Sequence, residues 1–272
     1  MSMDKINNLK NDIRNGTQIL AKCGIPIQGK KIMDVGCYLG LQCFGAMELG
    51  AGEAVGIDIP EYYVNQSTNN ESVDASKVLE NKRDKIRKLH PHLDQSKISF
   101  KDVSVFEMDY ENEFDIIFSW ETFEHIMNPK EALARIYKAL KPGGIVFSQY
   151  NPFFCISGGH SMCTLDFPFA HTLLTDEDFK KYVETIVPEN APPKYSELSY
   201  NFFTKNLNRM TQNDLTKYIN DVGFELVNFM SMPDLSLLNV IDDSTLDSAK
   251  TIHPTLTLND LLCSSVYFIG RK

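Results

Sequence analysis

The sequence predicts an α/β fold with a doubly wound, mostly parallel sheet, and three observations lead to this prediction. An apolar segment, Lys31–Val35, runs into a glycine-containing turn at Gly36–Gly40. A second apolar segment follows and ends in the carboxylate of Asp58. Strand-like and helix-like segments then alternate to about residue 150. Strands that alternate with helices in this way usually lie parallel in one sheet, with helices on both faces.

The turn after the first strand predicts a site for an adenosine-containing cofactor. Gly36 and Gly40 allow the backbone to pass close to a ligand. Asp58, at the end of the second strand, can accept hydrogen bonds from both ribose hydroxyls. Tyr38 occupies the middle position of the glycine pattern, where its side chain would crowd a pyrophosphate. A dinucleotide is therefore disfavoured.

The other elements of the core follow in order. The expected elements are strands at 98–103, 114–121 and 145–150, a helix over 129–140, and a Pro-Gly-Gly stop at 140–144. Towards the C-terminus, Thr211 should cap a helix that Gly223 ends. Strands at 224–229 and 266–270 then complete the fold.

Over about residues 30–150, the chain resembles class I S-adenosylmethionine (SAM)-dependent methyltransferases. Two motifs, together with the order of these elements, carry the resemblance: Asp34-Val35-Gly36-Cys37-x-x-Gly40 and Leu140-Lys141-Pro142-Gly143-Gly144. The resemblance implies a Rossmann-like seven-stranded sheet with an antiparallel C-terminal strand. Tyr38 stands where that family usually has glycine, and Asp102 would bond the adenine amino group. The expected cofactor-binding residues are Asp34, Gly36, Cys37, Tyr38, Gly40, Asp58, Ile59, Asp102, Val103 and Ser119.

Four regions are expected: a helical lead-in (1–29), the SAM-binding core (30–150), a substrate lid inserted after the fifth strand (151–210), and the C-terminal part of the core (211–272). The lid assignment depends on residues 151–210, which do not continue the alternation of strands and helices. Aromatic residues, paired glycines and two histidines, His160 and His171, occur within this segment. Such a composition suits a closing loop.

A short acidic segment, Glu121, Glu124 and His125, follows the fourth strand. If a helix begins at or just before Glu121, these three side chains share one face and could hold a divalent ion such as Mg²⁺ or Mn²⁺. The E-x-x-E-H pattern resembles the metal-binding segment of small-RNA and ubiquinone-pathway O-methyltransferases. The resemblance to the RNA enzymes implies a later histidine as a further ligand, here His171 or His160. A metal-free role for the Glu-His pair beside the cofactor remains the alternative.

The predicted reaction is transfer of a methyl group to an oxygen of a small polar metabolite, such as a sugar or a phosphorylated compound. His160 is the expected general base, with His125 as a second candidate. Two other classes remain open: a SAM-binding protein without transferase activity, and a nicotinamide-dependent oxidoreductase.

Bulk properties limit the partners. The net charge of −9 over 272 residues argues against nucleic acid as the main partner. No apolar run approaches the roughly 20 residues of a membrane helix, and a cytoplasmic protein without a membrane partner is expected; its oligomeric state is left open. The basic run Lys82–Lys88 predicts a solvated helix face, and His90 and His92 are expected in an exposed loop.

Overall fold

The structure, a computed structural model, describes residues 16–59, 74–158, 160–187, 191 and 194–272. Most of the expected helical lead-in lies outside the described residues, and residues 16–22 are helical. No helix within the described part of the chain is both long and apolar enough to cross a membrane.

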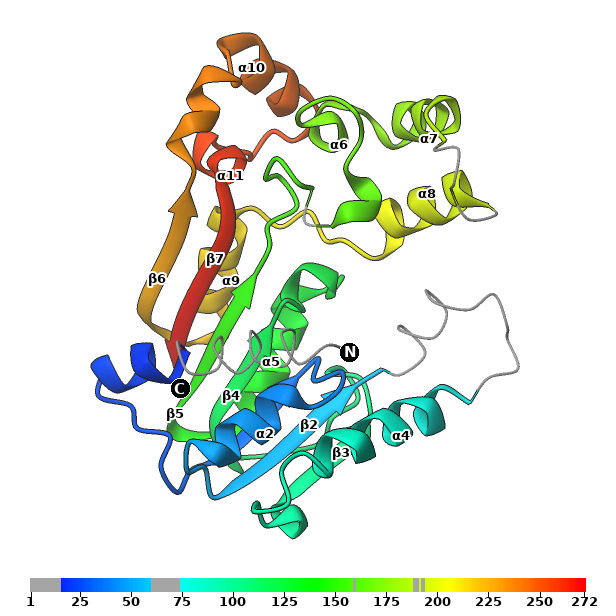
Figure 1. The fold of residues 1–272 in the computed structure, drawn as a ribbon. Helices are drawn as coiled ribbons and strands as arrows, with labels where there is room; N and C mark the ends of the chain where they lie inside the picture. Colours follow the sequence, from blue (N-terminus) through cyan, green and yellow to red (C-terminus); the bar gives the residue numbers. More distant parts are fainter. Residues whose placement is uncertain (1–15, 60–73, 159, 188–190, 192–193) are drawn as a thin grey trace. The chain divides into compact units, whose positions relative to one another are not determined.

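The strands form a seven-stranded sheet with the order β3-β2-β1-β4-β5-β7-β6, which confirms the predicted Rossmann-like fold (Figure 1). The β1 strand pairs in parallel with β2 and β4, and β2 pairs in parallel with β3. The strands are β1 (Lys31–Val35), β2 (Glu53–Asp58), β3 (Ile98–Asp102), β4 (Phe114–Trp120), β5 (Leu140–Tyr150), β6 (Glu225–Pro233) and β7 (Cys263–Arg271).

Helices fill most of the connections. The α-helices are α2 (Leu41–Glu48), α4 (Ala75–Arg87), α5 (Pro129–Ala139), α6 (Ala170–Leu173), α7 (Asp176–Thr185), α8 (Tyr195–Lys205), α9 (Gln212–Val222), α10 (Asp243–Ile252) and α11 (Leu258–Leu262). Short 3-10 turns are η1 (Gln95–Lys97), η2 (Phe123–His125), η3 (Ser161–Cys163) and η4 (Leu235–Asn239). The α9 helix has the predicted ends, because Thr211 and Asp214 form a capping box and Gly223 closes it with φ 104°.

The fifth strand begins earlier than predicted. Leu140–Gly144 does not form a separate stop, because β5 starts at Leu140 directly after α5. The Gly143 N–H donates to the Lys272 carbonyl oxygen, and the Lys272 N–H donates to that of Gly144, both at 2.9 Å. The start of β5 thus pairs with the residue that follows β7, so the two segments run antiparallel.

The chain divides into two compact units. The first unit comprises Met1–Trp120, Glu131–Ser148 and Ile269–Lys272. The second unit comprises Glu121–Lys130 and Gln149–Phe268 and so includes the whole segment predicted as a lid. Ile32, Ile117 and Phe118 are fully buried in the first unit. In the second unit, the buried rings of Phe179 and Phe203 stack with centroids 3.8 Å apart.

Candidate functional site

The turn between β1 and α2 is held against the end of β2. The N–H groups of Gly36 and Cys37 donate to the Ile57 carbonyl oxygen at 2.9 and 3.1 Å. Gly36, Tyr38 and Gly40 all have left-handed backbone angles, with φ of 81°, 43° and 75°. Glycine adopts this region without a Cβ clash, which explains why a tyrosine is unusual at the middle position.

Two glycines leave room for close packing beneath this turn. A Cβ added to Gly40 would lie 2.2 Å from the Phe100 ring. A Cβ on Gly56 would lie 2.6 Å from the Cys37 sulfur and 2.7 Å from the same ring. The ring of Phe100 in β3 therefore packs directly against Gly40 of the turn and Gly56 of β2. The sequence alone did not indicate this role.

The carboxyl ends of β2 and β3 bring two acidic side chains together. Asp58 and Asp102 are register partners. Asp58 is only 8% exposed, and its carboxylate accepts hydrogen bonds from the N–H groups of Tyr38 and Ile59. Ser119, the register partner of Val35, donates its hydroxyl to the Val35 carbonyl oxygen. Asp58 is thus fixed in orientation by the turn whose ligand it is expected to bind.

Asp34 lies beneath the turn, 1% exposed. Burial, with a smaller contribution from the charge of Asp58, raises the pKa of its carboxyl to about 8. Its Oδ2 atom is buried and has no hydrogen-bond partner in the structure. A protonated carboxyl could donate a hydrogen bond from this position.

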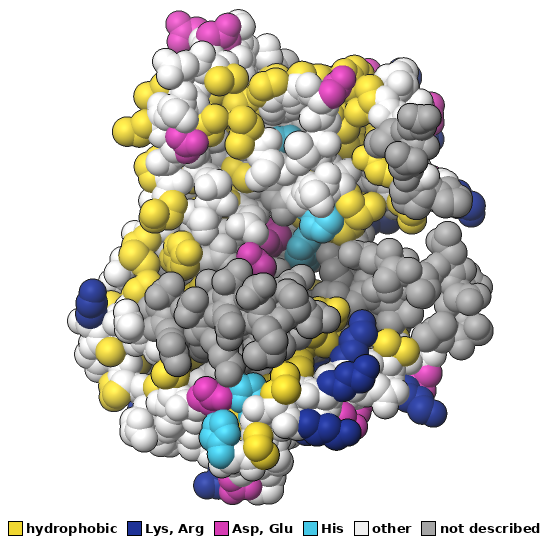
Figure 2. All heavy atoms as spheres, viewed as in Figure 1, with side chains coloured by type: hydrophobic (Ala, Val, Ile, Leu, Met, Phe, Trp, Pro, Cys, Tyr) yellow, Lys and Arg dark blue, Asp and Glu magenta, His cyan; other side chains and the backbone are white. Residues whose placement is uncertain are grey.

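Arg83 was predicted to be solvated with the rest of the basic run, and this prediction is wrong. Lys and Arg side chains gather over α4 in Figure 2, but Arg83 is 1% exposed. Its Nε and Nη2 atoms donate to the Tyr38 carbonyl oxygen at 3.0 and 2.8 Å, and Nη1 lies 3.5 Å from Asp102. The guanidinium packs over the Phe100 ring, with its central carbon 4.5 Å from the centroid.

The first unit fits an adenosine-containing cofactor. The fixed carboxylate of Asp58 suits ribose hydroxyls, and Asp102, with a side chain 36% exposed, remains accessible. Gly36 and Gly40 have no side chain, so a ligand can approach the backbone of the turn at these positions. Tyr38, between them, is the one position of the glycine pattern that carries a side chain. The expected residues of β1, β2, β3 and β4 therefore meet at one edge of the sheet.

In the second unit, the helix on which the predicted metal site depended is not present: no α-helix begins at Glu121. Glu121 is exposed and left-handed, with φ 47°, and its N–H donates to the Gln149 carbonyl oxygen at 3.0 Å. Only the 3-10 turn η2 follows. The three side chains therefore do not have the i, i+3, i+4 spacing of one helical face.

Glu124 and His125 are nevertheless held firmly. Glu124 is 2% exposed, and its Oε1 accepts from the Asn151 N–H at 3.3 Å, whereas Oε2 has no hydrogen-bond partner. Burial raises its pKa to about 8. His125 Nδ1 donates to the Asn206 carbonyl oxygen at 2.8 Å, so the neutral ring has Nε2 as its acceptor. Burial lowers the His125 pKa to about 4.

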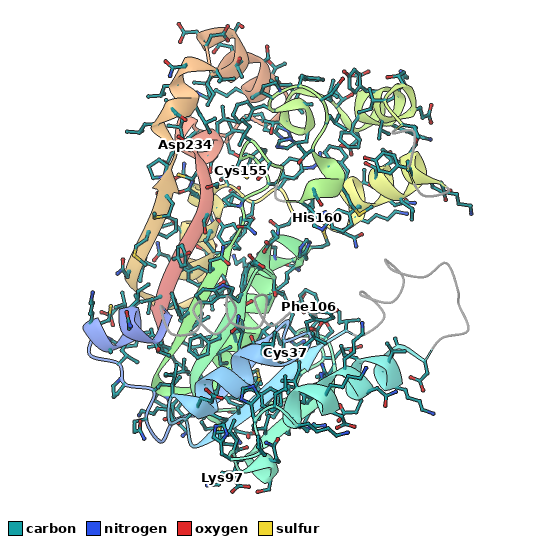
Figure 3. All side chains as sticks on the ribbon, in the orientation of Figure 1. Cys37, Lys97, Phe106, Cys155, His160 and Asp234 are labelled. Carbon is teal, nitrogen blue, oxygen red and sulfur yellow. The ribbon has the colours of Figure 1, made fainter. Side chains whose placement is uncertain are left out.

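His160, labelled in Figure 3, lies beside His125 in the second unit. Their ring centroids are 6.0 Å apart, and the His160 ring packs on Phe202 at 4.1 Å. His160 Nδ1 accepts from the Met162 N–H at 3.1 Å. The neutral ring therefore carries its proton on Nε2, where it can donate. Burial lowers the His160 pKa.

His171 is buried against Phe153 and Gly158. Its ring centroid is 5.3 Å from that of Phe153, and a Cβ on Gly158 would lie 3.1 Å from the imidazole. Burial lowers its pKa to about 4. Among the described residues, the structure does not gather Glu121, Glu124, His125 and His171 into a set of donors within reach of one ion.

Asn208 supports the acidic turn and was not predicted from the sequence. Its Nδ2 donates to the carbonyl oxygens of Phe123 and Ile126 at 2.6 and 2.8 Å. Its own N–H donates to the Glu124 carbonyl oxygen at 2.8 Å. These bonds hold both ends of η2. No local pattern marks this asparagine, because its partners lie more than 80 positions earlier.

Comparison with known proteins settles the family. A model described as a methyltransferase domain matches residues 9–228. The chain belongs to this family, the class I SAM-dependent methyltransferases. It is 26% identical over 126 residues to the mitochondrial ubiquinone biosynthesis O-methyltransferase of Dictyostelium discoideum. The matched segment covers 45% of this chain and 36% of that protein. The chain matches the first curated relatives over less than half of their length, 36–46%.

Solved structures show the same fold at low identity. A SAM-dependent methyltransferase from Mesorhizobium loti aligns with TM-score 0.52 at 12% identity, over 92% of this chain and 95% of that one. The [4+2]-cyclase SpnF aligns with TM-score 0.53 at 13% identity, over 95% and 80%. Because a cyclase shares the fold, the fold by itself does not assign the reaction.

Proposed function

We propose that this protein transfers the methyl group of SAM to a hydroxyl oxygen of a small molecule. The main support is the turn at Gly36–Gly40, with Asp58 and Asp102 in register beside it, in a chain of the methyltransferase-domain family. In this proposal Asp58 binds the ribose hydroxyls and Asp102 the adenine amino group. Asp34, Gly36, Cys37, Tyr38, Gly40, Ile59, Val103 and Ser119 form the rest of the cofactor site.

The acceptor that we propose differs from the polar metabolite expected from the sequence. Curated relatives are ubiquinone biosynthesis O-methyltransferases, which supports an oxygen acceptor and favours a lipophilic compound over a sugar. A mainly apolar molecule with a hydroxyl group is therefore the acceptor that we propose.

The bound cofactor supplies an electrophilic methyl group on a sulfonium. The protein has to orient the acceptor oxygen and remove its proton as the oxygen–methyl bond forms and the methyl–sulfur bond breaks. His125 is the better general base, because its Nδ1–H is bonded to the Asn206 carbonyl oxygen and Nε2 is the accepting atom. His160 has the opposite tautomer and would donate a hydrogen bond to the acceptor instead.

This assignment revises the expected order of the two histidines. The low His125 pKa of about 4 keeps the ring neutral at physiological pH, as a base must be, although it also makes the base weak. Among the described residues, the acidic segment does not bring its donors within reach of one ion, so the metal expected from the sequence has no part in this proposal.

The test is calorimetric titration of the full chain, treated with EDTA, with S-adenosylhomocysteine, followed by a methyl-transfer assay on small phenols. We expect the ligand to bind to the wild-type protein, and His125→Ala to lose turnover while keeping cofactor affinity. Loss of turnover in His160→Ala alone would reverse the two histidine roles. Absence of binding would contradict the whole proposal, and binding without turnover on any acceptor would favour a non-transferring protein. A fluorescence titration with NADH should show no binding.

A further inference from the structure

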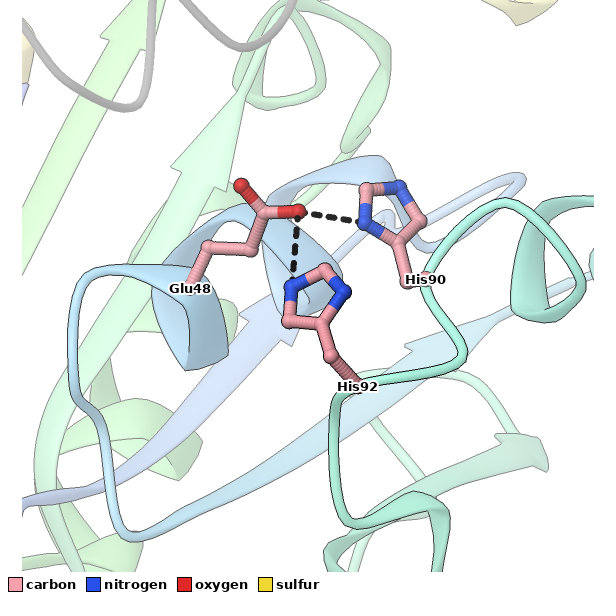
Figure 4. Close-up of side chains that lie close together, drawn as sticks. All are labelled: Glu48, His90 and His92. Carbon is pink, nitrogen blue, oxygen red and sulfur yellow. Dashed lines mark hydrogen bonds and ion pairs between the residues drawn. The ribbon is translucent and has the colours of Figure 1, made fainter.

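A second cluster of metal-ligating side chains lies in the first unit, away from the turn. Glu48, His90 and His92 each offer one ligand atom, and these atoms lie within 4.8 Å of one another (Figure 4). Glu48 Oε1 is 2.5 Å from His90 Nδ1 and 3.6 Å from His92 Nε2. Among the described residues this is the group of three or more such side chains that is close enough to share an ion.

His90 is not the exposed loop residue that the sequence suggested. Its side chain is 2% exposed, and its ring stacks on Phe44 with centroids 5.4 Å apart and an interplanar angle of 15°. Gln95 Nε2 donates to the His90 carbonyl oxygen at 2.8 Å, which fixes the loop. His92 is exposed, as predicted, with 62% of its side chain accessible. The cluster thus has a fixed ligand on the protein side and an adjustable ligand facing solvent.

We propose that Glu48, His90 and His92 bind a divalent transition-metal ion, with Zn²⁺ the best match. Two imidazole nitrogens and one carboxylate oxygen are typical ligands of Zn²⁺, whereas Mg²⁺ and Ca²⁺ prefer oxygen alone. Ligands at about 2.0–2.1 Å from a tetrahedral ion lie roughly 3.3 Å apart. The distance from Glu48 to His92 is already near this value.

The close contact between Glu48 and His90 is a hydrogen bond in the metal-free protein. An ion would replace the Nδ1 proton, which would move to Nε2 of the same ring, and the two ligand atoms would separate by about 0.8 Å to reach the spacing of metal ligands. Glu48 is the last residue of α2, where the helix dipole favours a cation. Water would complete the coordination.

The position of the cluster indicates a structural role for the ion. The α2 helix begins beside Gly40 in the cofactor turn and ends at Glu48, about 12 Å away along its axis. His90 and His92 follow α4, which carries Arg83. An ion here would join the end of α2 to the segment after α4 without touching the cofactor. It would therefore stabilise the two helices that support the turn.

The experiment uses the full chain without a histidine tag and after EDTA treatment. Zn²⁺ and Mg²⁺ are titrated separately by calorimetry, and Co²⁺ is followed by its visible absorption bands. We expect Zn²⁺ to bind and to raise the melting temperature, and Mg²⁺ to do neither. His92→Ala should weaken Zn²⁺ binding at least about tenfold and abolish the Co²⁺ bands. His92 is exposed, so this variant should keep its fold and its affinity for S-adenosylhomocysteine.

Glu124→Gln serves as the matched control, because it changes a carboxylate of the other candidate segment. It should bind Zn²⁺ like the wild type. Equal Zn²⁺ affinity in His92→Ala and the wild-type protein would overturn the proposal, as would the absence of any Zn²⁺ binding. Zn²⁺ binding lost in Glu124→Gln but kept in His92→Ala would place the ion in the second unit instead.

Discussion

Arg83 donates two hydrogen bonds to a single acceptor, the carbonyl oxygen of Tyr38, at 3.0 and 2.8 Å. The two residues are 45 positions apart, one in a charged helix and the other in the turn expected to bind the cofactor. The guanidinium is buried, and the carboxylates of Asp102, at 3.5 Å, and Glu80, at 3.9 Å, offset its charge. Arg83 therefore holds the turn in position.

We predict that Arg83→Lys weakens binding of S-adenosylhomocysteine by about tenfold or more, because one ammonium cannot reproduce the forked pair of bonds. Calorimetry on the purified variant measures this change. Arg87→Lys, one turn further along the same helix at a side chain 25% exposed, should bind like the wild type. Unchanged affinity in Arg83→Lys would show that the turn holds its shape without this residue.

Tyr38 adopts a left-handed backbone conformation with φ 43°. Tyr38→Gly should be tolerated, and Tyr38→Val should lower the free energy of unfolding by about 1–2 kcal/mol relative to the glycine variant, because a β-branched residue is strained there. Urea denaturation of the two variants gives the difference. Similar stabilities would mean that the turn changes conformation when the tyrosine is removed.

Glu124 should make stability depend on pH. Its folded-state pKa of about 8 lies above the ordinary value of 4.5, so the protein gains stability from its protonated form. This contribution is complete below about pH 4.5 and is lost as the pH rises through 8. Glu124→Gln should flatten the fall in stability between pH 5 and 8, by at most about 1.4 kcal/mol per pH unit.

Urea denaturation at several pH values measures this slope. Asp109→Asn is the control, since that side chain is 92% exposed, and its slope should match that of the wild type. A Glu124→Gln slope as steep as the wild-type slope would mean that Glu124 is ionised in the folded protein. The pKa of Asp34 is also raised to about 8, so this group too should lower stability as the pH rises. It should account for part of the pH dependence that remains in Glu124→Gln.

Asn208→Ala should destabilise the protein by about 1–3 kcal/mol, because the carbonyl oxygens of Phe123 and Ile126 lose their donor inside the second unit. It should also lower methyl-transfer turnover, since the displaced turn carries His125. Asn206→Ala is a close control: His125 bonds to the backbone oxygen of Asn206, which alanine retains. If both variants behave alike, the side chain of Asn208 does not hold the turn.

The sequence predicted those features that depend on neighbouring residues. The ends of α9 follow from Thr211, Asp214 and Gly223, which act within one or two turns of the helix. The proximity of Asp58 and Asp102 follows from the rule that neighbouring parallel strands have their carboxyl ends at the same edge of the sheet. These elements need no information from distant parts of the chain.

The features that were missed depend on residues far apart in the chain. Glu121 does not begin a helix because its backbone is left-handed, with φ 47°, and its N–H is held by the carbonyl oxygen of Gln149, 28 positions later. Arg83 is buried by the distant Tyr38 and Phe100. A signal for its burial was nevertheless present, since Arg83 falls between Leu79 and Ile86 on the buried face of α4. The helical spacing of Arg83 from Leu79 and Ile86 indicates burial more reliably than its charge indicates exposure.

The buried thiol of Cys37 offers a way to time the opening of the turn. It is 5% exposed, burial raises its pKa, and Arg83 Nη2 lies 3.6 Å from its sulfur. An alkylating reagent needs an accessible thiolate, so it can modify Cys37 only while the turn is transiently open. The rate of alkylation, read by mass spectrometry, therefore reports how often this happens. A ligand that closes over the turn should protect Cys37, whether or not any methyl group is ever transferred.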